Sequence, residues 1–445
     1  MELALGGIET LSFRQIEEAL GSELNETESI LRWVISRSDR TSVKVEYLVL
    51  GGYADELPGR RPCSSGLCVR PFDDASSFNC ALVIPTGAGA EIGGHAGDAG
   101  PVVRLMSQLC DTVITHPNTV NASDINEQPE NCLYVEGSVL SRFMQGLVGL
   151  QQARRNRVLV VVDAHKDELF SNAAVNSVNA ARATYGLDCA EVALLEPGVR
   201  LRAKYGRSGR AVGDIENLDY LVQLLRKRQS EFDAVAISSV IDVPPQFHFD
   251  YFASEGRMVN PWGGVEAMLT HAISTLTDIP SAHCPMFEAQ QIANADPGIV
   301  DPRMAAEAVS LTFIQCILKG LQRSPRIVPT PPLGQSHLMD VTNVSCLVIP
   351  DGCLGIPTLA ALNQGIPVVA VRENKNLMQN NLSLLPWASG QFYLAENYWE
   401  AAGIVASLKA GIAPGSVRRP LLPVRTSVFR EREFFNESAH TEEVT

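Results

Sequence analysis

Runs of apolar residues separated by polar turns divide the chain into predicted strands and helices. Continuous apolar runs, typical of strands that are buried on both faces, occur at 80–84, 157–163 and 234–240. Apolar residues at helical spacing lie between them, for example over 172–185 and 215–226. Strands that alternate with helices in this way predict an α/β fold with mostly parallel sheets, which we expect to form Rossmann-like lobes around a central cleft.

The first 40 residues carry helical signals instead. Ser12 and Gln15 have the spacing of a capping box, and a second helix is expected to begin near Asn25. Alternating apolar and polar residues then predict a strand over 43–49. We therefore expect residues 1–40 to form a helical N-terminal cap, which would serve as a contact in a homo-oligomer.

Changes in this pattern divide the rest of the chain into four parts. A first α/β lobe with a glycine-rich loop is predicted for 41–156, and a second α/β lobe for 157–330. A closing α/β unit with a second glycine loop follows at 331–425, and a charged tail at 426–445. Within the second lobe we expect one long amphipathic helix over 303–322.

The glycine-rich loop is the strongest candidate for a ligand site. Five glycines, one histidine and one aspartate lie within the thirteen residues that follow Pro85. Glycines there can adopt positive φ and present N–H groups to a ligand, and the N-terminus of a following helix adds partial positive charge. The loop therefore predicts a site for a small anionic metabolite, phosphorylated or carboxylated. The expected backbone donors are Gly87, Gly89, Gly93 and Gly94.

Four residues near strand ends are candidates for catalysis. His95 is the candidate general acid–base residue, because imidazole titrates near neutral pH. Asp98 or Asp163 would orient its ring or hold a cation. Asp163 ends a buried strand and precedes His165 by two residues, a pair that could hold a metal or a proton in transit. The alternative is a turn residue beside a surface histidine.

A polar cluster follows the strand predicted over 112–115. It contains His116, the fourth catalytic candidate, together with Asn118 and Asn121. Ligands in open α/β sheets bind at the carboxyl ends of strands, so these side chains are expected to face the same crevice as the glycine loop. The alternative is that the two asparagines only cap turns.

The sequence Asn-Pro-Trp-Gly-Gly-Val-Glu begins another predicted helix. Asn260, Gly263 and Gly264 would make its amino end a second site for an anion or a stacked ring, and the alternative is an N-capped helix with a packed tryptophan. Glu266 and His271 are five residues apart, about 140° around a helix, and are not expected to converge on one ligand.

The strand at the glycine loop has an echo near the C-terminus. Leu-Val-Ile-Pro-Thr-Gly-Ala at 82–88 returns as Leu-Val-Ile-Pro-Asp-Gly-Cys at 347–353. The repeat adds Asp351 and Gly352 to the candidate ligand-binding residues, because it could place two glycine loops across one cleft. The alternative is a chance similarity between two buried strands.

Charge and composition exclude several classes of partner. The net charge of −14 and the pI near 5.1 argue against nucleic acid and against an anionic membrane surface. The stretch 200–210 is a basic exception, read as a loop that meets a phosphate or carboxylate, or else as a solvated loop. The ten cysteines include no Cys-x-x-Cys pair, and neither a secretory signal nor a membrane span is expected, so we predict a cytoplasmic protein.

Longer motifs carry a resemblance to known families. Pro-Thr-Gly-Ala-Gly-Ala-Glu-Ile-Gly-Gly-His-Ala-Gly-Asp, Thr-His-Pro-Asn-Thr-Val-Asn-Ala-Ser and Asn-Pro-Trp-Gly-Gly-Val-Glu-Ala-Met resemble the uncharacterised cyanobacterial and plastid family known as domain of unknown function 3326. The resemblance implies a cytoplasmic or plastid stromal setting and no particular reaction. Gly93-Gly94-His95 and the stretch 352–367 also look like parts of a twin-Rossmann glycosyltransferase, although the helix over 358–363 has no acidic residue to hold a ribose.

Three functions fit these observations. The first is an enzyme that binds an anionic metabolite in the glycine-rich cleft and carries out group transfer. The second is a metal-dependent hydrolase or lyase, and the third is a ligand sensor or assembly protein without catalysis. No cofactor is specified by the sequence. The metal ligands in the second case would come from His95, Asp98, His116, Asp163, His165 and His283.

Overall fold

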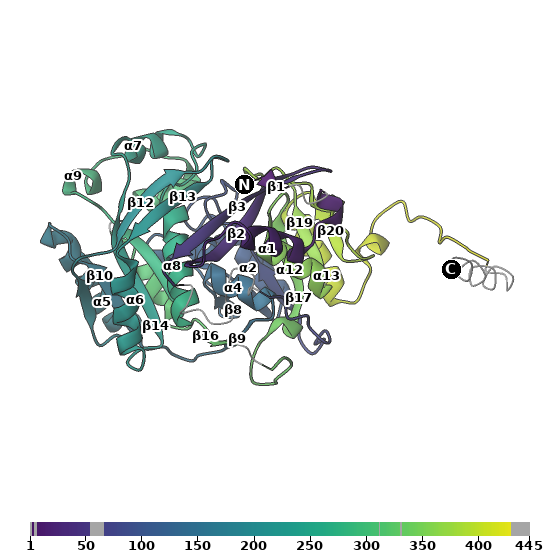
Figure 1. Ribbon diagram of the computed structural model, residues 1–445, viewed down its shortest axis with the longest axis horizontal. Coiled ribbons are helices and arrows are strands. Elements are labelled where there is room, and N and C mark those ends of the chain that lie inside the picture. The colour runs from purple at the N-terminus through teal and green to yellow at the C-terminus, as the bar shows by residue number, and fades with distance from the viewer. Residues whose placement is uncertain (1, 4–6, 54–65, 311, 330–331, 429–445) are drawn as a thin grey trace.

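Two six-stranded sheets, built mainly from parallel strands, form the centre of the protein (Figure 1). The computed structural model describes residues 2–3, 7–53, 66–310, 312–329 and 332–428. Helices pack on both faces of each sheet, and one cluster of buried apolar residues contains side chains from both. The mixed α/β class with parallel sheets, predicted from the sequence, is confirmed.

The first sheet has the strand order β20-β19-β17-β4-β5-β8, and all its pairings are parallel. The echoed segments meet at its centre, where Leu82 lies opposite Val348. Helices α2 and α13 pack on one face, and α4 and α12 on the other. The elements are β4 (Asn79–Leu82), β5 (Thr112–Thr115), β8 (Cys132–Tyr134), β17 (Val344–Pro350), β19 (Val368–Val371), β20 (Phe392–Ala395), α2 (Gly100–Leu109), α4 (Gly137–Met144), α12 (Ile356–Gln364) and α13 (Tyr398–Lys409).

The second sheet has the order β11-β10-β14-β12-β13, with β15 also paired to β14. Its pairings are parallel except for the antiparallel pair β12 and β13. Helices α5 and α11 cover one face, and α6 and α8 cover the other. The elements are β10 (Val158–Asp163), β11 (Val192–Leu195), β12 (Arg200–Tyr205), β13 (Ala211–Glu216), β14 (Ala234–Asp242), β15 (Ser281–Met286), α5 (Glu168–Tyr185), α6 (Leu218–Arg228), α8 (Gly263–Thr277) and α11 (Gln315–Leu321).

The N-terminus is a β-hairpin with a short helix, so the prediction of a helical cap is wrong. The capping box of Ser12 and Gln15 does begin helix α1 (Phe13–Gly21). The second expected helix is instead the long strand β2 (Glu28–Ser38), which pairs with β3 (Val43–Gly51). β2 contains Trp33 and the β-branched residues Ile30, Val34 and Ile35, and pairing with the adjacent strand β3 outweighed its weak helical periodicity. Strands β1 (Glu2–Leu3) and β18 (Leu354–Gly355) complete this four-stranded sheet.

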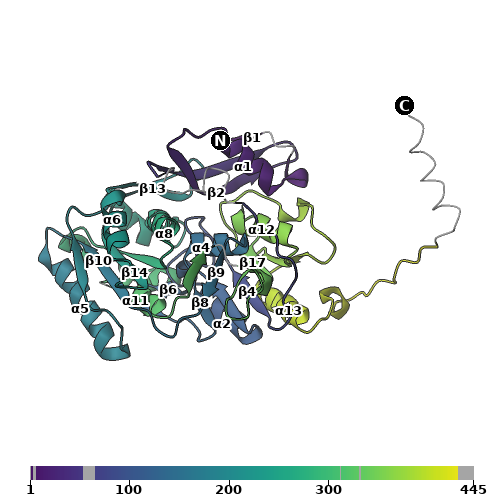
Figure 2. The same cartoon turned by 60° about the horizontal axis from the view of Figure 1, so that its bottom comes forward.

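The hairpin lies as a layer across both large sheets (Figure 2). On one side β2 pairs with β18, which directly precedes α12 of the first sheet. On the other side Glu46 of β3 forms an ion pair with Arg210, 3.2 Å away, at the turn of the β12–β13 hairpin. The N-terminal layer therefore bridges the two halves of the molecule.

The basic stretch 200–210 was expected to be a loop, but only its last five residues, the turn of the β12–β13 hairpin, are outside a strand. Its first six residues form β12, and its charged side chains project from the exposed face while Leu201 and Ala203 are buried. Arg202 pairs with Asp242 at 3.4 Å, and Lys204 pairs with Asp214 at 2.7 Å. Neighbouring strands thus supply the acids that neutralise this stretch.

The long helix expected over 303–322 is broken. The structure has a 3₁₀ turn η2 (Pro302–Met304), a short helix α10 (Ala305–Ala308) and then α11. Between them the carboxylate of Asp124 accepts hydrogen bonds from the hydroxyls of Ser310 and Thr312. Side chains that bond elsewhere in this way compete with helical hydrogen bonding, which explains the break.

The remaining elements are short connections and the C-terminal arm. After α13 the described chain extends away from the body in both views (Figures 1 and 2), and residues 429–445 of the charged tail expected at 426–445 lie outside the described residues. In the described part of the chain, no helix combines the length and apolar character of a membrane span. The short elements are α3 (Pro117–Val120), β6 (Asn121–Ala122), β7 (Ile125–Asn126), β9 (Val148–Gln151), α7 (Gln246–Ala253), α9 (Gln290–Ala293), β16 (Arg326–Pro329), η1 (Ile8–Thr10), η3 (Val341–Asn343), η4 (Leu382–Leu384) and η5 (Pro414–Val417).

Candidate functional site

A pocket of about 470 Å³ lies beside helix α8 and receives residues from both large sheets. From the first sheet, Thr86, His116 and Glu136 reach it from the segments that follow β4, β5 and β8. From the second sheet, the end of β15 forms part of its wall, and α7 and the segments around α9 and α10 contribute further residues. Ligands commonly bind at such positions beyond the carboxyl ends of parallel strands.

Residues predicted at the end of β5 do reach this pocket. His116 is buried and its Nε2 accepts a hydrogen bond from the backbone N–H of Ile84 at 3.1 Å. Burial lowers the pKa of His116 to about 4, so its ring is neutral near pH 7. Asn118 donates to the carbonyl of Gly93 at 2.7 Å, and Asn121 donates to the hydroxyl of Tyr134 at 2.8 Å. Both asparagines line the pocket, and their hydrogen bonds also hold neighbouring segments in place.

The glycines of the predicted loop mainly allow close packing and do not line the pocket. A Cβ on Gly87 would lie 2.8 Å from the carbonyl oxygen of Ala211, and one on Gly264 would lie 2.2 Å from the same oxygen. Gly87 has φ of +70°, which also favours glycine. The loop, the β12–β13 hairpin and the start of α8 thus meet at one crowded point. A Cβ on Gly89, Gly93 or Gly94 would likewise come too close to an atom of Val259, Ile84 or Ala90, respectively.

His95 and Asp98 lie behind the pocket wall. The Nδ1 atom of His95 is 2.7 Å from the hydroxyl of Tyr251, and burial followed by the charge of Arg303 lowers the pKa of this histidine. Asp98 accepts a hydrogen bond from the N–H of Gly93 at 2.9 Å, and burial raises its pKa to about 7. Neither side chain is among the residues that line the pocket.

The other predicted carboxylates also lie elsewhere. Asp163, at the end of β10, accepts a hydrogen bond from the N–H of Val199 at 3.1 Å, and burial raises its pKa to about 7. Asp351 accepts from the N–H of Gly352 at 2.9 Å beyond the end of β17, and burial raises its pKa. Neither the two aspartates nor Gly352 lines the pocket, whereas the predicted Asn260 and Gly263 do.

Glu266 is a carboxylate in the pocket wall, in the first turn of α8. One of its oxygens, Oε2, lies 3.1 Å from Nδ1 of His283 on β15. The other ring nitrogen of His283 lies 2.7 Å from the hydroxyl of Ser239 on β14. Ser239 has no exposed surface and does not line the pocket, so the serine stands behind the histidine and Glu266 is the member that faces the cavity.

A second carboxyl group, that of Glu307 on α10, lines the same pocket. Its Oε1 accepts hydrogen bonds from the backbone N–H of Ala96 at 2.8 Å and from the amide of Asn260 at 3.1 Å. Burial raises the pKa of Glu307 to about 7, although these donors favour the charged form. The carboxyl is therefore held in a fixed orientation and is balanced between its two protonation states near neutral pH.

A third carboxylate in the pocket wall is fully engaged by protein groups. Glu136 caps α4, and its Oε2 accepts from the N–H of Ser138 at 2.9 Å. Its Oε1 is bonded to Nδ1 of His271, and the Nε2 atom of that ring lies 2.9 Å from Nη1 of Arg32 on β2. Because arginine can only donate, Nε2 of His271 accepts this bond and Nδ1 donates to Glu136. This buried chain connects the N-terminal hairpin to α8 and α4.

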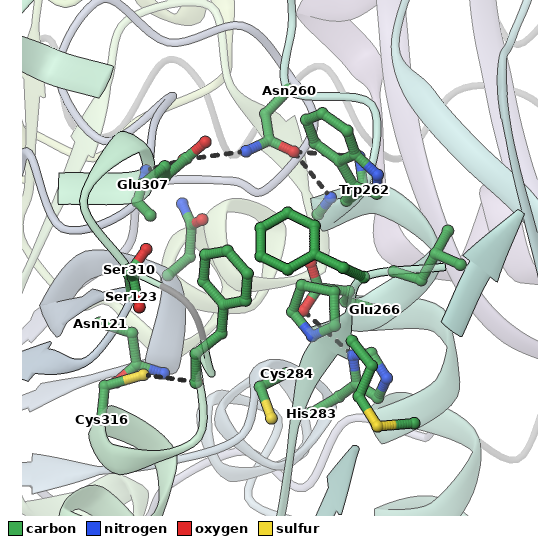
Figure 3. A pocket seen from close by; sticks show the side chains of 18 of the residues that line it. Asn121, Ser123, Asn260, Trp262, Glu266, His283, Cys284, Glu307, Ser310 and Cys316 are labelled. Carbon is green, nitrogen blue, oxygen red and sulfur yellow. Dashed lines mark hydrogen bonds and ion pairs between the residues drawn. The ribbon is translucent and has the colours of Figure 1, made fainter. Parts of the chain in front are cut away.

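Aromatic and apolar groups form most of the remaining wall. Trp262 packs edge-on against Tyr251 with ring centroids 5.2 Å apart, and Phe287 and Phe313 pack with centroids 5.0 Å apart. Figure 3 shows Trp262 with Asn260 and Glu307 at one side of the cavity, and Glu266 with His283 at another. None of the described residues in the wall is Lys or Arg.

Two polar atoms of the wall are buried without a hydrogen-bond partner among the described residues. One is Oγ of Ser123, a side chain that is 5% exposed, and the other is Nε2 of His248. Ser123 also has φ of +53°, which is uncommon for a residue with a side chain. Buried polar groups are normally paired, so each of these two atoms is a candidate partner for a polar group of a ligand.

The residues predicted as alternative metal ligands do not form a metal site in the described part of the chain. In the described part of the chain, no group of three or more His, Cys, Asp or Glu residues is arranged to hold a metal ion. His283 is bonded to Glu266 and Ser239, and Nδ1 of His165 accepts from the N–H of Asp167 at 2.9 Å.

Three carboxylates of the pocket wall were not among the site residues predicted from the sequence. Glu136 follows strand β8 as His116 follows β5, so the same strand-end rule could have found it. Glu266 was noted but set aside because it points away from His271, and the structure does give the two residues different partners. Glu307 lies on an element predicted as an ordinary helix, and no local signal indicates it.

The fold and the pocket define an α/β protein with an aromatic, carboxylate-containing cavity beside the ends of two parallel sheets. The model of the family described as "Protein of unknown function (DUF3326)" matches residues 79–418, and the chain belongs to this family. A protein of Synechococcus sp. named "Uncharacterized lipoprotein" is 31% identical over 347 residues, which is 77% of this chain and 93% of that protein. No solved structure matches the chain.

Proposed function

We propose that this protein is an enzyme that binds a small organic molecule in the pocket and transfers a proton through Glu307. In this proposal the two sheets act as Rossmann-like lobes, with the pocket as the cleft between them. The observation that supports it best is a half-buried carboxyl in the pocket wall, which is held by the N–H of Ala96 and the amide of Asn260 and pairs with no cation among the described residues.

Proton transfer suits this carboxyl for two reasons. A general acid or base works best when its pKa lies near the working pH, and burial raises the pKa of Glu307 to about 7. Fixed donors on Oε1 keep the group aimed in one direction, which reduces the reorganisation needed when a substrate binds. Glu266 would bind and orient the substrate from the other part of the wall.

Group transfer to or from an anionic metabolite, expected from the glycine loop, stays a prediction. The described wall of this pocket offers carboxylates and no Lys or Arg, which favours proton transfer on a molecule that is not an anion. A binding protein without catalysis is the outcome if a ligand is found and no turnover accompanies it.

The test is a search for turnover in heavy water. The purified full chain is incubated with a metabolite extract in D₂O, and mass spectrometry records compounds that are consumed or that gain deuterium. We expect at least one such compound with the native protein. Glu307→Gln should lower the rate by about 10²-fold or more, since general acid–base catalysis contributes at least that much.

Glu216→Gln is the matched control. Glu216 is an exposed carboxylate of β13, 3.8 Å from Arg200 and outside the pocket, so this variant should keep the native rate. The proposal is wrong if no compound is turned over, or if Glu307→Gln is as active as Glu216→Gln.

Location is a separate part of the proposal. The sequence predicts a cytoplasmic protein, whereas the Synechococcus relative is named a lipoprotein, a class that is anchored to a membrane. Fractionation of cells into soluble and membrane parts, followed by immunodetection of the full chain, decides between the two.

A further inference from the structure

The pocket wall contains more acidic than basic side chains. Glu266 and Glu288 contribute carboxylates, Asp296 adds one at an exposed position, and none of the described residues in the wall is Lys or Arg. Glu136 is also there, but its charge is taken up by His271, Arg32 and the start of α4. An anionic ligand would therefore be repelled, and a cationic one attracted.

Glu266 has one carboxylate oxygen available to bind a cationic ligand. Its Oε2 is bonded to Nδ1 of His283. A neutral His283 ring satisfies both of its hydrogen bonds when Nδ1 donates to Glu266 and Nε2 accepts from the hydroxyl of Ser239. Its Oε1 makes no hydrogen bond with any residue in the described part of the chain, and the side chain is 21% exposed. One carboxylate oxygen is thus fixed by the protein and the other is open to a ligand.

The aromatic walls suit a cation for an independent reason. The faces of Trp, Tyr and Phe rings carry negative potential and attract ammonium groups within about 6 Å. Trp262, Phe249, Phe252, Phe287 and Phe313 all line the pocket. An apolar or aromatic frame would bury its surface against the same rings.

Two further atoms of the wall are available to bind polar groups elsewhere on the ligand. Ser123 Oγ and His248 Nε2 are buried polar atoms with no partner among the described residues. Burial lowers the pKa of His248, so its ring is neutral and can accept.

We infer that the pocket selects an organic cation, an amine carried on an apolar or aromatic frame, with Glu266 as its counter-ion. This inference rests on the proposed function because it names the class of ligand for the same pocket. Glu266 binds and orients the amine, while Glu307 remains the group that exchanges a proton with the substrate.

The test uses three probes of nearly equal shape and different charge. Isothermal titration calorimetry measures binding of 2-phenylethylammonium, neutral 2-phenylethanol and anionic 3-phenylpropanoate to the full chain at neutral pH. We expect the cation to bind at least about tenfold more tightly than the alcohol, which corresponds to the energy of one desolvated cation–π contact with its counter-ion. The anion should bind most weakly of the three.

Glu266→Gln should remove the preference for the cation over the alcohol, and Glu216→Gln should keep it. The inference is overturned if the anion binds as tightly as the cation, if none of the probes binds, or if the preference survives in Glu266→Gln. Binding and catalysis fail separately. A cation preference that depends on Glu266, together with a Glu307→Gln variant of native activity, would leave the ligand class intact and remove the proposed proton transfer.

Discussion

Glu136 and Glu266 both pair with a histidine beside helix α8, and yet the two pairs differ in almost every other respect. In the first pair α8 supplies His271, and in the second it supplies Glu266. Glu136 is buried, at 4% exposure, and both of its oxygens bond to protein groups. Glu266 keeps one oxygen open to the pocket.

The electrostatic surroundings explain this difference. Burial alone would raise the pKa of Glu136, but His271 and the hydrogen bonds from Ser138 hold it at about 2. Arg32 then supplies a cation behind His271. The same types of side chain thus make a structural link when every lone pair is used, and a ligand-binding group when one is left open.

The largest effect should come from breaking the buried pair. Glu136→Gln removes a buried carboxylate that offsets the charge of the half-buried Arg32, and it weakens the cap of α4, so the free energy of unfolding should fall by about 3–5 kcal/mol. Glu266→Gln should change it by less than about 1 kcal/mol, because that side chain is partly exposed. Urea denaturation of both variants measures the difference, and equal losses would refute the distinction between the pairs.

Glu307 extends the comparison, because this pocket carboxyl has no basic partner among the described residues. Its raised pKa means that the folded state favours the protonated form, so its contribution to stability is complete below about pH 4.5 and is lost as the pH rises through 7. Glu307→Gln imitates the neutral acid. Relative to the native protein it should gain about 1–3 kcal/mol at pH 8 and almost nothing at pH 4, measured by urea denaturation across this range.

Replacing Arg32, which bonds to His271, should lower the free energy of unfolding by a smaller amount. Arg32→Met leaves Nε2 of His271 without its donor, so the free energy of unfolding should fall by about 1–2 kcal/mol. Arg37→Met, on an exposed residue of the same strand β2, is the control and should be close to neutral. If the two variants unfold at the same denaturant concentration, the hydrogen bond between Arg32 and His271 does not stabilise the fold.

The smallest effect is predicted for Ser239. Ser239, His283 and Glu266 are bonded in the order of a serine hydrolase triad, but the serine is fully buried and outside the pocket wall. Ser239→Ala should therefore cost at most about 1 kcal/mol and leave turnover in the D₂O experiment near the native rate. Loss of turnover, or labelling of Ser239 by a sulfonyl fluoride, would show that the serine is a nucleophile.

The sequence predicted the fold well where one local pattern decides the structure. Buried parallel strands such as β10 and β14 are continuous apolar runs, and they were located within a residue or two. Strand β2 was missed because its apolar residues also fit a helix, and its pairing with β3 is a tertiary contact. The helix at 303–322 failed for a similar reason, since Asp124 lies far from it in the sequence.

The candidate pocket contains only some of the residues that the sequence predicted for the site. It includes His116, Asn118 and Asn121, which follow a strand end, and Asn260 and Gly263, which lie at the start of α8. The glycines of the loop lie at close contacts outside this pocket, and close packing and anion binding favour the same residue type. Glu307 could not have been found, because only the folded chain brings it to Asn260 and the N–H of Ala96.

The pairing of β4 with β17 has a consequence for how the chain folds. Asn79, the first residue of β4, donates a hydrogen bond to the carbonyl of Asn343, 264 positions later, so the centre of the first sheet closes only after most of the chain has left the ribosome. Until then the edge of β4 stays open to other strands. We expect slow folding with a populated intermediate and a need for chaperones during synthesis, as is common for chains dominated by distant contacts.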